Sequence, residues 1–151
     1  MNHESNQELR NIVLCKVFEQ FLKLLQAKEE QGVPNFIHEV IVMVPPIGED
    51  DTALPFYYMP QTWEKQLKRY SVTLRMVDYE GDNKNHSYDQ WIQGWLAASA
   101  SSQYFLFSED DYYLDSNPLL DVMMIEYYKK TFPNGIGYLT SYAADQIGRA
   151  H

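Results

Sequence analysis

The chain has 151 residues, of which 45% are hydrophobic and 15% aromatic, so it is long enough for one core and too apolar for a disordered segment. Its 21 acidic and 12 basic residues give a net charge of −9, which disfavours general binding to nucleic-acid phosphates. No stretch approaches the roughly 18 unbroken apolar residues of a membrane span. The single cysteine, Cys15, excludes an internal disulfide, and the polar N-terminal residues do not fit a secretory signal. We expect one soluble, cytoplasmic domain over residues 1–151.

Helix and strand patterns alternate along the chain. Apolar residues recur at helical spacing over about Asn6 to Gln31, and Ile37 to Val44 is a nearly continuous β-branched run, typical of a strand covered on both faces. The Gly, Pro and acidic residues of 48–60 favour a loop. We predict helices at 6–31, around 63–70, at 88–100 and at 119–130, and strands at 37–44, 72–77, 104–107 and 136–141. This order indicates an α/β fold, a mainly parallel sheet with helices on both faces.

Two tryptophans lie one turn apart in the helix expected at 88–100. Large aromatic residues at this spacing belong to a core more often than to a binding site, so we expect Trp95 to be buried, with Ile92 and Leu96 on the same inner face. Trp91 remains a candidate for stacking on a base or a sugar ring, together with Tyr88.

Three consecutive carboxylates, Glu109, Asp110 and Asp111, follow the strand predicted at 104–107. Ligands of open α/β sheets collect at the carboxyl ends of the strands, and carboxylate oxygens suit Mg²⁺ or Mn²⁺. Equally, such a cluster can be a solvated junction between a strand and a loop. The cluster alone leaves both interpretations open. The sequence contains no nucleophile-elbow pattern, phosphate-binding glycine loop or zinc-ligand spacing.

The surroundings of this acidic cluster resemble a known family. The run "YEGDNKNHSYDQWIQGWLAASASSQYFLFSEDD" (79–111) is similar to the segment of GT-A glycosyltransferases that carries their DxD-type motif, and "IVMVPPIGEDD" (41–51) resembles their second strand and base-contacting loop. The likeness covers about residues 6–143. It implies an incomplete Rossmann-like GT-A domain that uses Mn²⁺ or Mg²⁺ to bind a nucleotide-diphosphate sugar. Such a domain transfers a hexosyl or N-acetylhexosaminyl group to a carbohydrate or other hydroxyl acceptor.

The resemblance also implies roles for individual residues. Asp111 is the first candidate metal ligand and Glu109 the second, while Asp110 is expected to contact the sugar or ribose. The candidate residues for contact with the rest of the nucleotide-sugar are Asp50 and Asp51 at the base, Asn83 and Asn85 in the loop before the helix, and Trp91. The metal is expected to stabilise the diphosphate leaving group while an acceptor hydroxyl attacks the sugar.

Two features depart from the family pattern. The residues before Asn6 leave no room for the central strand that precedes the first helix in GT-A domains, and 151 − 111 = 40 residues follow the acidic cluster. Asp145 is the acidic residue placed late enough to act as a catalytic base. The sequence therefore resembles a piece or a reduced member of the family, and the alternative is a non-catalytic interaction domain with solvated acidic loops.

Overall fold

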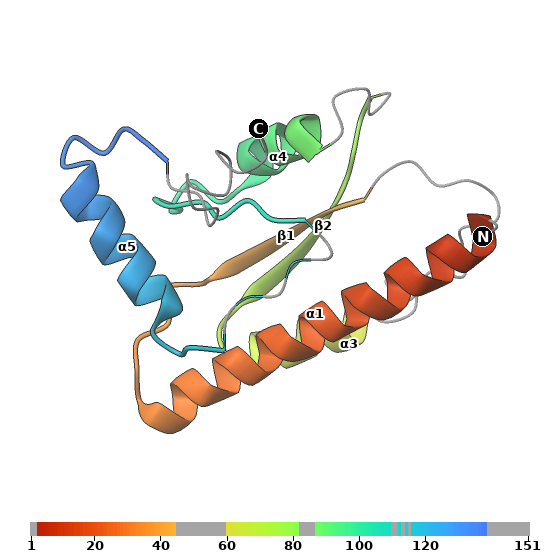
Figure 1. The fold of residues 1–151 in the computed structure, drawn as a ribbon, viewed down its shortest axis with the longest axis horizontal. Coiled ribbons are helices and arrows are strands. Elements are labelled where there is room, and N and C mark those ends of the chain that lie inside the picture. Colours follow the sequence, from red (N-terminus) through yellow and green to blue (C-terminus); the bar gives the residue numbers. More distant parts are fainter. Residues whose placement is uncertain are drawn as a thin grey trace, which may run out of the picture.

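The fold is a mixed α/β arrangement in which helices pack on a small parallel sheet (Figure 1). A computed structural model describes residues 3–44, 60–81, 87–109, 112, 114 and 116–138. Within these residues the elements are α1 (His3–Gln31), β1 (Glu39–Val44), α3 (Pro60–Lys68), β2 (Thr73–Asp78), α4 (Ser87–Ala97) and α5 (Leu120–Thr131). No helix among them is both long and apolar enough to cross a membrane. Each of these elements was predicted from the sequence to within a few residues.

The two strands lie side by side and run in the same direction. Residues 39–44 of β1 pair in register with residues 73–78 of β2, beginning at Glu39 opposite Thr73 and ending at Val44 opposite Asp78. Since the strands are parallel, their carboxyl ends meet at one edge of the sheet. The predicted parallel pairing is confirmed for these two strands.

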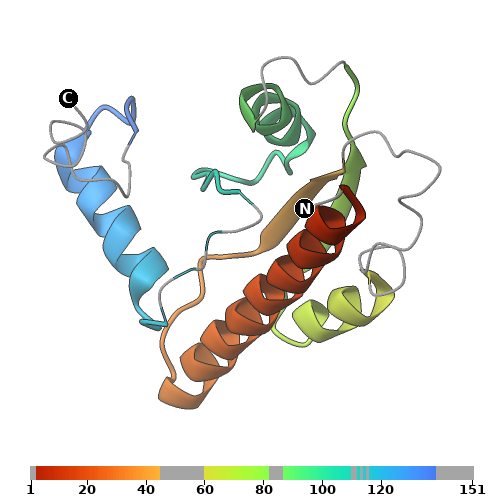
Figure 2. The same ribbon diagram turned by 45° about the vertical axis from the view of Figure 1, so that its right-hand side comes forward.

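Helices α1 and α3 cover one face of the sheet (Figure 2). Their buried side chains form the core with Leu74 of β2, and the rings of Phe18 and Trp63 stack at a centroid distance of 4.1 Å. Val40 and Val42 of β1 pack against the same cluster. This packing accounts for the helical spacing of apolar residues in α1, because that face is the one buried.

Helix α4 lies on the opposite face, and one of its glycines lies against β1. A Cβ placed on Gly94 would lie 3.3 Å from the Sδ atom of Met43 and 3.9 Å from a methyl carbon of Ile41. The prediction of the inner face of this helix is wrong: Ile92 and Trp95 are each 52% exposed and Leu96 is 73% exposed. The small residue lets the helix approach β1 closely and turns those larger side chains outward.

The strand predicted at 104–107 is not formed. These residues carry no ladder, and the described sheet consists of β1 and β2 alone. The rings of Phe105 and Phe107 lie beside Trp95 and Trp91 of α4 instead, and the Tyr104 ring contacts α5. All four residues of the segment are exposed. The apolar, aromatic pattern therefore predicted a strand where the structure has an exposed segment outside the described sheet.

The strand predicted at 136–141 is also wrong for the described residues 136–138. The hydroxyl of Tyr128 donates to the carbonyl oxygen of Gly137 at 2.7 Å, so the chain after the helix folds back on α5. Gly135 at the turn has a φ of 75°, in the left-handed region that glycine tolerates. Ile136 and Tyr138 are consequently exposed, and residues 139–141 lie outside the described residues.

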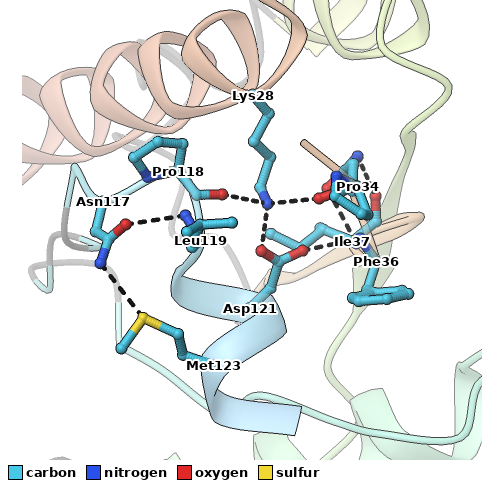
Figure 3. A network of polar contacts seen from close by, with 10 residues as sticks. Lys28, Pro34, Phe36, Ile37, Asn117, Pro118, Leu119, Asp121 and Met123 are labelled. Atoms are coloured by element: carbon cyan, nitrogen blue, oxygen red, sulfur yellow. Dashed lines mark hydrogen bonds and ion pairs between the residues drawn. The ribbon is translucent and has the colours of Figure 1, made fainter. Parts of the chain in front are cut away.

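Helix α5 is fixed to α1 by a buried lysine (Figure 3). The Nζ of Lys28, which is 2% exposed, donates to the carbonyl oxygens of Pro34 and Pro118 and to Oδ1 of Asp121. The other oxygen of Asp121 accepts the backbone N–H of Phe36 at 2.8 Å. Each donor of the ammonium group has an acceptor, which is the condition for tolerating a buried charge.

Candidate functional site

The candidate site lies at the edge of the sheet where β1 and β2 end. Asp78, the last residue of β2, is exposed, whereas Tyr79 is buried and its hydroxyl donates to Oδ2 of Asp89 in α4 at 3.4 Å. Gly81 follows with a φ of 143°, and a Cβ there would lie 2.8 Å from the Tyr79 hydroxyl oxygen. The turn after β2 therefore requires glycine at position 81.

The side chain of Gln93 fixes α4 to the end of β2. Its Oε1 accepts the backbone N–H of Glu80 at 3.0 Å, and its Nε2 donates to the carbonyl oxygen of the same residue at 2.5 Å. An amide side chain matches both backbone groups of one residue in this way because it carries one donor group and one acceptor. This contact holds the first turns of α4 next to the end of the sheet where β1 and β2 finish.

The residue just before the acidic cluster is fixed to the same helix. The indole Nε1 of Trp91 donates to the carbonyl oxygen of Ser108 at 3.0 Å. The Trp91 ring is half-buried between Tyr88, at a centroid distance of 5.6 Å, and Phe107, at 5.7 Å. Trp91 thus positions the backbone that leads into the acidic cluster, a role that the sequence did not suggest.

Glu109 is the member of the acidic cluster that lies within the described residues. It is exposed, and its carbonyl oxygen accepts the backbone N–H of Tyr112 at 3.3 Å. An exposed carboxylate is a hard oxygen donor of the kind that Mg²⁺ and Mn²⁺ prefer, so Glu109 fits the expected metal chemistry. Within the described residues no three Asp, Glu, His or Cys side chains gather into a metal-binding group.

The other candidate residues from the sequence lie outside the described part of the chain. These are Asp110, Asp111, Asp50, Asp51, Asn83, Asn85 and Asp145. The described segments that flank them, the ends of β1 and β2 and the start of α4, lie at one end of the sheet.

Sequence reasoning missed three residues that build this edge, namely Tyr79, Asp89 and Gln93. Their partners lie 10 to 13 positions away, at separations that no helix or strand period marks. The available signal was weak: polar residues in the first turns of a helix that begins beside a strand end. Comparisons of the chain with protein-family models, with curated proteins and with solved structures found no match.

Proposed function

We propose that this protein is a metal-dependent glycosyltransferase domain of GT-A type, which binds a nucleotide-diphosphate sugar at the carboxyl edge of its sheet and transfers the sugar to a hydroxyl acceptor. Two side-chain contacts of α4 carry the proposal. The Trp91–Ser108 hydrogen bond holds the residue before the acidic cluster on α4, and Gln93 holds the end of β2 on the same helix. These contacts support the proposal, because ligands of α/β sheets bind at the carboxyl ends of the strands.

The proposed metal ligands are Asp111 and Glu109. Mn²⁺ or Mg²⁺ bound there would supply Lewis-acid stabilisation of the diphosphate leaving group. An acidic protein with a net charge of −9 needs such a cation to bind an anionic ligand. The exposed Glu109 carboxylate reaches solvent, where a diphosphate would lie.

The remaining roles belong to residues of the chain itself. Asp110 is proposed to accept from a sugar or ribose hydroxyl, and Asp50 or Asp51 from the base. Asn83 and Asn85 complete the nucleotide-sugar site, and Asp145 is the candidate base for the acceptor hydroxyl. In this proposal Trp91 is a positioning residue, since its donor group is bonded to Ser108.

Thermal unfolding with a panel of nucleoside diphosphates, each with Mn²⁺ and without it, tests the proposal. A ligand that binds only the folded state stabilises it by RT ln(1 + [L]/Kd), about 2.7 kcal/mol at a ligand concentration near 100 Kd. We expect at least one diphosphate to raise the Tm only when Mn²⁺ is present. A folded protein whose Tm responds to no combination contradicts the proposal.

A further inference from the structure

The backbone groups of β1 divide between its two edges. The carbonyl oxygen of His38 accepts the N–H of Thr73 at 2.9 Å, and the carbonyl oxygen of Val44 accepts the N–H of Tyr79 at 2.8 Å. Alternate residues of a strand direct their backbone groups to the same side. The even-numbered residues from 38 to 44 therefore bond to β2.

The odd-numbered residues Glu39, Ile41 and Met43 consequently direct their N–H and C=O groups away from β2. No third strand of the described chain pairs with this outer edge. The side chains of Ile41 and Met43 face α4 at Gly94, so both faces of β1 are covered, while its outer edge has no partner strand within the described residues. An apolar edge without lysine or proline is a template for another strand.

The chain segment nearest this edge does not close it. A hydrogen bond of 3.0 Å between His38 and Ser102 places the start of residues 104–107 near the start of β1. The rings of Phe105 and Phe107 contact α4, at centroid distances of 6.2 and 5.7 Å from its tryptophans. These contacts hold the segment on α4, and it forms no ladder with β1. Residues 104–107 therefore do not supply a strand that pairs with β1.

Acidic side chains at the carboxyl end of the sheet favour a positively charged partner. Asp78 and Glu80 are exposed there, in a protein of net charge −9. A partner with basic residues at this end would meet complementary charge, which favours association and fixes orientation.

We propose that the outer edge of β1 binds an extended apolar strand of a partner polypeptide, which lies parallel to β1 and is followed by basic residues. Only another peptide strand matches a row of alternating backbone donors and acceptors, and this mode of recognition is strand addition to a sheet edge. The parallel direction follows that of the existing pair, because wholly parallel sheets are over-represented among sheets covered on both faces. The interaction needs no metal or nucleotide, so it stands apart from the proposed function.

Amide hydrogen exchange, followed by NMR on the full chain, tests this inference. The probe is a synthetic strand of about six alternating valine and threonine residues followed by two lysines. In the free protein the Ile41 and Met43 amides should exchange fast while those of Val40 and Val42 are protected by β2. At a peptide concentration near 100 Kd, exchange at Ile41 and Met43 should slow roughly 100-fold and the contrast should disappear.

Two control peptides sharpen the test. A proline in the middle of the first control peptide removes one backbone donor of the ladder and should abolish the protection. In the second control peptide, two glutamates replace the lysines and should weaken binding, with the larger effect at low salt. Three results would overturn the inference. The first is unchanged exchange at Ile41 and Met43 when the probe is added. The second is protection of these amides in the free protein at low concentration, which would mean that residues 104–107 close the edge. The third is protection that grows with protein concentration alone, which would mean that a second copy closes it.

Discussion

Trp91 donates its indole N–H to the carbonyl oxygen of Ser108 at 3.0 Å and so joins α4 to the backbone that leads into Glu109. This bond connects the part of the fold that is packed on the sheet with the part proposed to bind the ligand. It also distinguishes Trp91 from Trp95, which is half-exposed and contacts Phe105 through its ring.

The variant Trp91→Phe tests this positioning role. Phenylalanine keeps an aromatic ring beside Tyr88 and Phe107 but lacks the N–H donor. Loss of one hydrogen bond of about 1 kcal/mol predicts a roughly five-fold weaker affinity for nucleoside diphosphate with Mn²⁺. Trp95→Phe is the matched control and should bind as the wild type does, in the same calorimetric titration. Equal affinities for the two variants would show that Trp91 does not position the ligand-binding segment.

The buried lysine should matter for stability. In Lys28→Met the Asp121 carboxylate loses its cation and stays largely buried, so the free energy of unfolding in urea should fall by roughly 3 kcal/mol. Changing Asp121→Asn in addition removes the unpaired charge while the amide oxygen still accepts from Phe36, and should recover part of the loss. A double variant less stable than Lys28→Met would contradict this explanation.

Gly94 sets the distance between α4 and β1. In Gly94→Ala the new methyl lies 3.3 Å from the flexible Met43 side chain, and a gain in helix propensity of about 1 kcal/mol offsets the tight contact. Gly94→Leu cannot be accommodated in this way and should lower the free energy of unfolding by roughly 1–3 kcal/mol. Urea denaturation of both variants measures the difference. If leucine is tolerated as well as alanine, α4 does not pack on β1 through this residue.

The thiol of Cys15 should make the stability of the protein depend on pH. Burial, and to a lesser degree the Glu19 carboxylate, raises the pKa of its thiol above the ordinary value of 9.0. Folding therefore favours the protonated thiol, so this contribution to stability is present below pH 9.0 and is lost as the pH rises through the higher pKa of the folded state. Between about pH 7 and about pH 10 the wild type should lose more stability than Cys15→Ala, in urea denaturation at each pH. Identical pH profiles would show that the thiol makes no such contribution.

The elements of this fold were predictable where a local pattern sufficed. The helical spacing of apolar residues in 6–31 predicted α1, and the β-branched run ending at Val44 predicted β1. In each case one short stretch of sequence carries the whole pattern. The pairing of residues 104–107 was not predictable, because an apolar extended segment looks the same whether it joins a sheet or rests on a helix. Gly94 explains the misjudged face of α4, since hydrophobic periodicity gives no weight to a glycine that allows close packing.

For the candidate site, the sequence predicted a type of chemistry but not the contacts that build its surroundings. Consecutive acidic residues after an apolar segment, Glu109 first among them, indicated hard-cation chemistry at a strand end. The contacts that position this segment were not visible, because Trp91 to Ser108 and Gln93 to Glu80 join residues 17 and 13 positions apart through side chains. Such distances depend on how α4 packs on the sheet, which follows from the whole fold.

Isothermal titration of wild type and Asp111→Asn with a nucleoside diphosphate, with Mn²⁺ and without it, tests the central claim most directly. We predict binding to the wild type that requires Mn²⁺, and affinity at least roughly ten-fold weaker in the variant, because the amide is a poor substitute for a charged metal ligand. The same affinity in both proteins, or binding that does not depend on Mn²⁺, would contradict a metal site at the acidic cluster.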